Sequence, residues 1–179
     1  IVAITAAQAA MVSVMTVTPV HVREHGHGLG VVGLVMSAHF VGMFGLAPVA
    51  GRLLARTRPA PMLGGGAAVL CAGAVGAGLA PGEHSPLTAL FLFLLGLGWS
   101  ATFVAASSLV AAGGSAATAV RRQGLVDTVA WSASGLASAG AGVMVNATSY
   151  SSVGLAGAAV ALCGPVLALA LHQRRGRLA

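Results

Sequence analysis

Six apolar stretches, separated by short polar breaks, make up most of this chain, and Asp127 is the only charged residue inside any of them. A helix needs roughly 20 apolar residues to cross the hydrocarbon core of a bilayer. The breaks contain glycine, proline, histidine and arginine, which mark turns and membrane boundaries. The sequence therefore predicts an all-α transmembrane fold, a six-helix bundle with a C-terminal tail over 172–179. The spans are expected at about 1–20, 29–50, 61–80, 87–111, 124–145 and 151–171.

The composition excludes the soluble classes of protein. Hydrophobic residues make up 57% of the chain and charged residues only 7%, whereas a soluble domain carries about 25% charged residues. Each apolar stretch is about twice the length of a barrel strand, so helices are expected rather than strands. The cations are all arginines beside apolar stretches, which is typical of membrane-flanking charge and argues against nucleic acid as a partner. No nucleotide motif is present, and neither a cofactor nor a metal is predicted.

Arginine placement predicts the orientation of the spans. The second and fourth loops and the tail carry all but one of the arginines, whereas the first, third and fifth loops together carry only Arg23. Arginine accumulates in the cytoplasmic loops of membrane proteins. Both termini are therefore expected in the cytoplasm, in a multi-pass protein of the plasma (inner) membrane. The arginines assigned to the cytoplasm are Arg52, Arg56, Arg58, Arg121, Arg122, Arg174, Arg175 and Arg177.

Polar side chains are unevenly shared among the predicted spans. The third span from Met62 and the sixth span from Val153 contain no hydroxyl, amide or charged side chain, whereas the other four contain several. Polar groups are costly in hydrocarbon unless they face protein or water, so the other four spans are expected to face a cavity. This division into two groups of three is typical of the inverted three-helix repeats of a transporter. Alternatively, the hydroxyls bond only to the backbone of their own helices.

The break after the second span resembles the cytoplasmic loop motif of a known family, G-x-L-x-D-R-x-G-R. Gly51, Leu53, Arg56 and Arg58 fit this motif loosely, and Ala55 stands at its acidic position. The stretches 18–27 and 96–99 also look like bacterial members of that family. With its six predicted spans, the chain resembles the C-terminal six-helix half of a major facilitator superfamily transporter.

The resemblance implies secondary active transport of a small molecule by alternating access, with proton coupling as the expected driving force. The chain begins with Ile1 rather than Met, so we expect a fragment whose partner is a missing N-terminal six-helix half or a second copy. In the family, the acid of the loop motif helps to lock a cytoplasmic gate, and Ala55 lacks that group. The residues expected in the loop motif here are Gly51, Arg52 and Arg56.

His39 and Asp127 lead the candidates for the substrate and proton pathway. His39 lies near the middle of the second span, where an ionisable side chain is a functional candidate by default, and a neutral packing role is equally open. Asp127 lies one turn from the cytoplasmic end of the fifth span, where it either binds a proton or stabilises a helix N-terminus. The full set of pathway candidates is Gln8, Thr16, His39, Trp99, Ser100, Thr102, Asp127 and Trp131.

The first external loop contains a group of three histidines, His21, His25 and His27. Imidazoles are common ligands of Zn²⁺ and Cu²⁺, but this spacing fits no closed site. A solvated loop is expected there in place of a metal site.

Two other classes of protein remain open. The residues around Ser100 resemble the serine motif of a rhomboid-type intramembrane protease, in which Ser100 would need His39 as its base, although the two residues stand in the reverse order along the chain. A non-catalytic six-span subunit or an inactive fragment is the other alternative. Transport is the leading hypothesis. The chain is therefore predicted not to be an enzyme.

Overall fold

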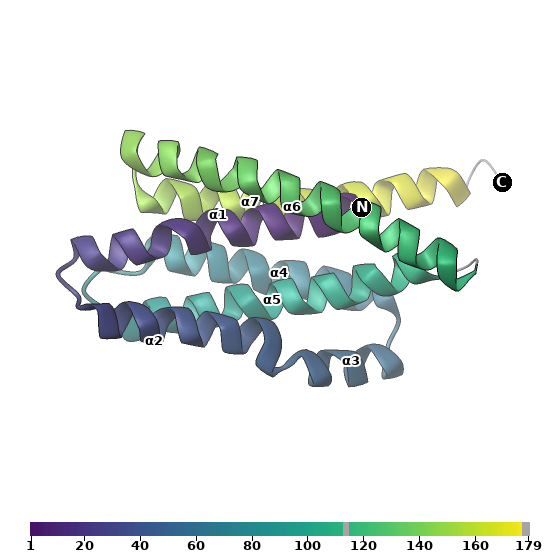
Figure 1. Ribbon diagram of the computed structural model, residues 1–179, viewed down its shortest axis with the longest axis horizontal. Helices are drawn as coiled ribbons and strands as arrows, with labels where there is room; N and C mark the ends of the chain where they lie inside the picture. Colours follow the sequence, from purple (N-terminus) through teal and green to yellow (C-terminus); the bar gives the residue numbers. More distant parts are fainter. Residues whose placement is uncertain (113–114, 177–179) are drawn as a thin grey trace.

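The structure is a computed structural model that describes residues 1–112 and 115–176, with the backbone alone described over 168–176. Every regular element in these residues is a helix, and the described part contains 6 spans long and apolar enough to cross a membrane (Figure 1). The prediction of an all-α transmembrane fold is confirmed. The elements are α1 (Val2–Glu24), α2 (Leu29–Phe40), the π-helical turn η1 (Val41–Gly45), α3 (Ala47–Arg56), α4 (Pro59–Leu79), α5 (Ser85–Ala111), α6 (Ala116–Ala147) and α7 (Tyr150–Gly176).

The second span consists of three consecutive pieces, α2, η1 and α3, rather than one continuous α-helix. Pro48 lacks a backbone N–H, and its ring would clash with the carbonyl of residue 44 in a regular helix. The chain therefore leaves the α-helical path at η1, and α3 restarts with Pro48 in its first turn, where the missing donor is tolerated. Single π-helical turns inside helices often occur at functional sites. The sequence did not predict this turn.

The break expected at 51–60 is mostly helical. Gly51, Arg52 and Arg56 lie on α3, and only Thr57 and Arg58 connect it to α4. Arginine, leucine and alanine are good helix formers, so α3 continues past the end of the apolar stretch. The loop motif predicted from these residues is therefore a motif on the last turns of a helix, which corrects the expected loop.

The break expected at 113–123 is also shorter than predicted, because α6 begins at Ala116 and carries Arg121 and Arg122 on its first two turns. Its start is capped by Ser115, whose hydroxyl accepts a hydrogen bond from the backbone N–H of Thr118 at 3.3 Å. The backbone of the predicted tail, 172–179, continues α7 to residue 176. The remainder of that tail, which includes Arg177, lies outside the described residues, as do the side chains of Arg174 and Arg175.

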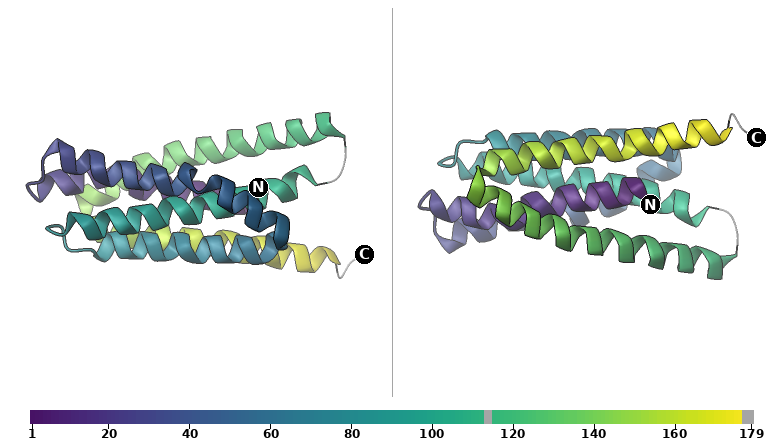
Figure 2. Two further views of the ribbon diagram at one scale, coloured as in Figure 1. Left: turned by 90° about the horizontal axis from the view of Figure 1, so that it is seen from below. Right: turned by 90° about the horizontal axis from the view of Figure 1, so that it is seen from above.

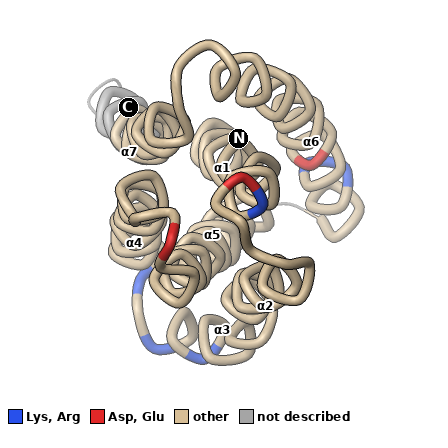
Figure 3. The backbone as a smooth tube through the Cα atoms, turned by 90° about the vertical axis from the view of Figure 1, so that its left-hand side faces the viewer, with Lys and Arg blue, Asp and Glu red and all other residues tan. Residues whose placement is uncertain are grey.

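Four spans form the centre of the bundle and two lie at its edge. The spans of α1, α4, α5 and α7 bury between 44% and 56% of their most apolar window. The spans of α2–α3 and α6 bury only 22% and 17%. Figure 3 shows α2 and α6 on one side of the bundle and α4 and α7 on the other. The apolar third span, α4, packs closely between α5 and α7.

Glycine explains how α4 reaches this central position. A Cβ on Gly98 of α5 would meet the backbone of Leu70 and Gly66 on α4. A Cβ on Gly154 of α7 would meet the backbone of Gly78 on α4. Small residues let helix backbones approach closely in lipid, where packing rather than the hydrophobic effect holds helices together. Glycine contacts with α5 and α7 thus hold the apolar α4 in the bundle.

The connections alternate between the two ends of the bundle. The α3–α4 connection and the C-terminal end of α7 lie at one end, and the connections at 25–28, 80–84 and 148–149 lie at the other (Figures 1 and 2). Six membrane-crossing helices with alternating connections require this arrangement. The arginines of α3 and of the first turns of α6 therefore share one end of the molecule.

Candidate functional site

A buried hydrogen bond joins α1 to α5 inside the bundle. The indole Nε1 of Trp99 donates to Oε1 of Gln8 at 2.6 Å, and the two side chains are 8% and 2% exposed. The amide nitrogen of Gln8 is also buried and has no partner among the described residues. A buried polar group in lipid is costly unless it is paired, so this unused donor is available to a ligand or a water molecule.

Aromatic rings surround the Trp99 indole. Phe103, one turn further along α5, stacks on it with ring centroids 5.1 Å apart, and Phe44 of η1 meets it edge-on at 6.1 Å. Phe44 is 60% exposed, so the aromatic group reaches the surface of the bundle beside η1. Sequence reasoning missed Phe44 and Phe103. The spacing of Trp99 and Phe103, four residues apart on one helix, was the only available signal for either.

His39 is fully buried between α2 and α5, with 0% of its surface exposed. Its Nδ1 lies 2.9 Å from the carbonyl oxygen of Leu92. A carbonyl only accepts, so Nδ1 carries the proton in this pair, and Nε2 of the neutral ring is an acceptor. That Nε2 is buried without a partner in residues 1–112 and 115–176. The arrangement gives His39 one structural hydrogen bond and one unused proton acceptor.

Two glycines hold His39 in this position. A Cβ on Gly96 of α5 would meet the carbonyl oxygen of His39, and a Cβ on Gly42 of η1 would meet the carbonyl oxygen of Phe93. The backbones of the second and fourth spans therefore touch at this crossing. The contact aligns the His39 ring with the Leu92 carbonyl.

Thr16 links α1 to α6 at the exposed side of the bundle. Its hydroxyl donates to the carbonyl of Val12 at 2.7 Å and accepts from the hydroxyl of Ser138 at 3.2 Å. The hydroxyl of Ser134, one turn before Ser138, bonds to the carbonyl of Ala130 on its own helix at 2.8 Å. Both alternatives for the hydroxyls thus occur, since some bridge two helices and others bond only to their own backbone.

Ser100 and Thr102 are buried in the bundle, with 2% and 0% of their surfaces exposed. Thr102 lies against Gly66 of α4, since a Cβ on that glycine would lie 2.6 Å from the threonine oxygen. Thr102 is therefore at the α4–α5 contact rather than beside the Gln8–Trp99 pair. The carbonyl that holds His39 belongs to Leu92, which precedes Ser100 by eight residues, or about 12 Å along α5. No serine–histidine pair exists at this site in the described residues, so the geometry does not support a rhomboid-type protease.

Asp127 and Trp131 lie on α6, at the edge of the bundle. The carboxylate of Asp127 is half-buried and accepts a hydrogen bond from the amide of Gln123 at 2.8 Å. The Trp131 side chain is 65% exposed. No hydrogen bond among the described residues joins either of them to Gln8 or His39. The predicted pathway residues thus form several separate groups rather than one cluster.

Of the three histidines expected in a solvated loop, His21 at the end of α1 and His27 contact neighbouring segments, whereas His25 is exposed. The ring of His21 stacks on Tyr150 of α7 with centroids 4.1 Å apart, and its centroid lies 4.4 Å from that of His25. His27 Nε2 lies 3.1 Å from the carbonyl oxygen of Gly82. Within the described residues no three His, Cys, Asp or Glu side chains are placed to hold a metal ion. These rings connect the outer ends of α1, α4 and α7.

Comparison with known proteins gives two relatives over most of the chain. It is 38% identical to the uncharacterized MFS-type transporter YdeG of Bacillus subtilis (strain 168) and 34% identical to the uncharacterized MFS-type transporter YddS of the same organism, over 87% of this chain in each case. The chain is a relative of the MFS-type transporters. It spans about a third of the length of these curated relatives, 36% of each. No family model and no solved structure matches the chain.

The relationship to MFS-type transporters agrees with the architecture. Six apolar helices make the chain part of a multi-pass membrane protein, and its relatives point to a transporter rather than to an enzyme. The resemblance predicted from the sequence is thereby confirmed.

Proposed function

We propose that the protein carries a small molecule across the plasma (inner) membrane by alternating access, driven by a proton gradient. The main support is the similarity of this chain, over 87% of its length, to two MFS-type transporters. Transporters of this type bind their substrates near the bilayer midplane, between two bundles that rock against each other. The Gln8–Trp99 pair and His39 are the buried polar groups of this bundle that suit such a site.

In this proposal the chain is the C-terminal six-helix half, and an N-terminal half, or a second copy, covers the edge formed by α2 and α6. Six glycines on these helices have open space where a Cβ would stand, which supports the close approach of other helices. α2 and α6 lie on the same side of the bundle (Figure 3). The six are Gly30, Gly33, Gly124, Gly135, Gly140 and Gly142.

The substrate would bind against the aromatic group formed by Trp99, Phe44 and Phe103. Aromatic rings provide a large apolar surface, and the unused amide donor of Gln8 provides one directional hydrogen bond. A molecule with an apolar body and a hydrogen-bond acceptor matches that combination. Thr16, on the same helix as Gln8, would extend the polar surface towards α6.

The proton would be accepted by Nε2 of His39, the unpartnered acceptor at the α2–α5 crossing. Asp127 on α6 is the second candidate, because an acidic side chain inside a span is rare and usually functional. Arginine at one end of the bundle supports a cytoplasmic position for both termini and for the end of α3. Proton binding at His39 would bias the packing of the second span against α5.

Transport by the purified full-length protein in vesicles with an imposed proton gradient tests this proposal, with a fluorescent organic cation as the first probe. His39→Gln keeps a donor for the Leu92 carbonyl but cannot take up a proton. We expect this variant to lose proton-driven accumulation and to retain exchange of probe across the membrane. Asp127→Asn is measured in parallel, and His84→Ala, an exposed external histidine, is the matched control.

Normal accumulation by both His39→Gln and Asp127→Asn would remove these residues from the coupling pathway. A full-length protein that moves no probe, amine, sugar or organic acid in either direction would contradict transport itself and favour a non-catalytic subunit. Each variant is first compared with the unmodified protein by size-exclusion chromatography, so that a loss of folding is recognised before transport is scored.

A further inference from the structure

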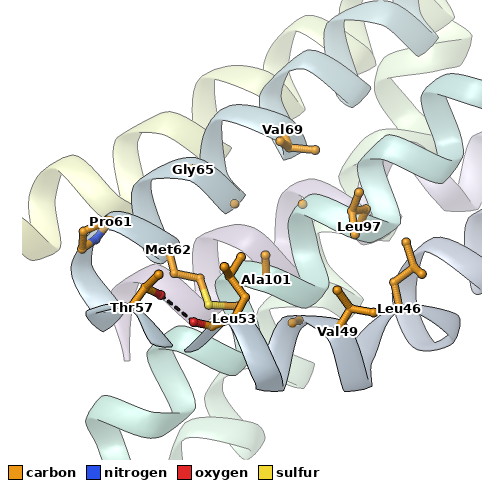
Figure 4. Close-up of a pocket in the computed structure, with 13 residues that line it drawn as sticks. Leu46, Val49, Leu53, Thr57, Pro61, Met62, Gly65, Val69, Leu97 and Ala101 are labelled. Carbon is orange, nitrogen blue, oxygen red and sulfur yellow. Dashed lines mark hydrogen bonds between the residues drawn. The ribbon is translucent and has the colours of Figure 1, made fainter. Parts of the chain in front are cut away.

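A deep apolar groove runs between α3 and α4, with α5 as its floor (Figure 4). Its volume is about 540 Å³, within the range of roughly 300–1,000 Å³ found for small-molecule sites. α3 packs on α5 and η1 and hardly touches α4, which leaves the space between them open. The side chains that define the groove are Leu46, Val49, Leu53, Val69, Leu97 and Ala101.

The groove is separate from the candidate transport site. Gly65 and Gly66 of α4 line it, and a Cβ on Gly65 would meet no other atom within 4 Å, so the absence of a side chain there leaves space in the groove. The Gln8–Trp99 pair lies between α1 and α5, and neither residue lines the groove. α4 lies on the opposite side of the bundle from α6 (Figure 3). The occupant of the groove therefore reaches it from a different side than a substrate bound between two bundles.

Cationic side chains lie at one end of the groove. Thr57, which lines that end, stands between Arg56 and Arg58, and both arginines are exposed. Arg56 follows Leu53 by three residues and Val49 by seven, so helical spacing places it on the groove side of α3. No acidic side chain pairs with either arginine within residues 1–112 and 115–176. The groove thus combines an apolar channel with an uncompensated positive end.

We propose that this groove binds one anionic glycerophospholipid, with an acyl chain between α3 and α4 and the phosphate on Arg56 and Arg58. From Thr57 to Leu46 the groove follows about 16 Å of helix, which matches half of the roughly 30 Å hydrocarbon core. An acyl chain that enters from the arginine end therefore reaches the bilayer centre. Guanidinium groups bind phosphate with paired hydrogen bonds and attract anionic lipids at the membrane surface.

The net positive end selects an anionic headgroup over a zwitterionic one. A zwitterionic lipid brings its own cation close to Arg56 and Arg58, whereas a phosphatidylglycerol brings only the phosphate charge. Each arginine near the membrane surface strengthens the binding of an anionic lipid by about fivefold. Two arginines therefore predict a preference of roughly 25-fold for the anionic lipid. The bound chain would also fill the space that separates α3 from α4.

Native mass spectrometry of the delipidated full-length protein, titrated with dioleoyl phosphatidylglycerol or dioleoyl phosphatidylcholine, tests the proposal. Gly65→Leu places a side chain in the groove, and we expect it to abolish the single high-affinity lipid. Gly64→Leu is the matched control, because Gly64 is the neighbouring residue on α4, has equally open space and does not line the groove. Arg56→Gln with Arg58→Gln should remove the preference for phosphatidylglycerol, whereas Arg121→Gln should preserve it.

Three results would overturn the proposal. The first is equal affinity of the unmodified protein for the two lipids. The second is equal lipid binding by Gly65→Leu and Gly64→Leu, which would place the lipid elsewhere. The third is equally tight binding of glycerol phosphate, which has no acyl chain and would indicate a phosphate site alone. None of these measurements depends on transport, so failure of the lipid site and failure of the proposed function are distinguishable.

Discussion

Gly96 is the point at which the second span meets α5, and Gly96→Ala tests how strongly that contact holds the bundle together. A Cβ at this position would meet the carbonyl oxygen of His39, the backbone nitrogen of Met43 at 2.9 Å and Cγ of Met43 at 3.0 Å. The first two are backbone atoms, which no change of rotamer can move. The two helices must therefore separate to accommodate one methyl group.

Two opposing terms set the size of the effect. Forcing an extra methyl group into a packed contact costs about 1–3 kcal/mol. Alanine is the better helix former and stabilises a helix by about 0.5–1 kcal/mol relative to glycine. The difference between the two terms is a loss of about 0–2.5 kcal/mol in the free energy of unfolding, with a central value of about 1 kcal/mol. Separation of the helices would also lengthen the 2.9 Å bond between His39 Nδ1 and the Leu92 carbonyl, so the proton coupling proposed above should weaken together with stability.

Unfolding of the full-length protein by SDS in mixed micelles, followed by far-ultraviolet circular dichroism, measures this difference. Gly64→Ala is the control, since a Cβ on Gly64 meets nothing within 4 Å and only the gain in helix propensity applies. We expect the midpoint to fall for Gly96→Ala and to stay or rise for Gly64→Ala. Equal midpoints for the two variants would refute the argument that the α2–α5 crossing depends on backbone contact at Gly96.

Two further predictions follow from single contacts. Gln8→Leu leaves the Trp99 indole N–H without its 2.6 Å partner and should lower the free energy of unfolding by about 1 kcal/mol in the same SDS titration; an unchanged midpoint would show that the pair contributes nothing to stability. In a background without native cysteines, single cysteines in place of Arg56 and Arg122 should both react with an impermeant maleimide added from the cytoplasmic side, and reaction from opposite sides would contradict the orientation.

The sequence predicted that some polar residues lie deep in the membrane, but it did not predict which residues they contact. His39 was predicted as an ionisable group deep in the membrane, and it is fully buried in the structure. Its hydrogen bond to Leu92, 53 residues away, was not predictable, because it depends on glycines of two helices meeting at one crossing. Trp131 was predicted as a pathway residue and is largely exposed, because α6 lies at the edge of the bundle, which the sequence did not predict.

The apolar groove between α3 and α4 could not be predicted from the sequence either. α3 carries its apolar side chains on one face and ends in arginine, a pattern that is visible in the sequence once the helix is known. The second span was predicted to end at residue 50. The second half of α3 was therefore predicted as a loop, and its one-sided apolar pattern was not recognised. The π-helical turn that redirects α3 away from α4 depends on Pro48 and on contact between Gly42 and α5.

The sequence alone determined that the chain lies in a lipid bilayer, how many helices are long and apolar enough to span it, and which end of the bundle carries arginine. The length, apolarity and flanking charge of a span are properties of adjacent residues, and they decide whether and in which orientation that span inserts into the bilayer. Only the tertiary structure decided that Gln8 meets Trp99, 91 residues away, that α4 lies in the centre, and that α3 stands apart from it. Those outcomes depend on which helix surfaces can approach to backbone contact, and that is settled jointly by small residues on two separate helices.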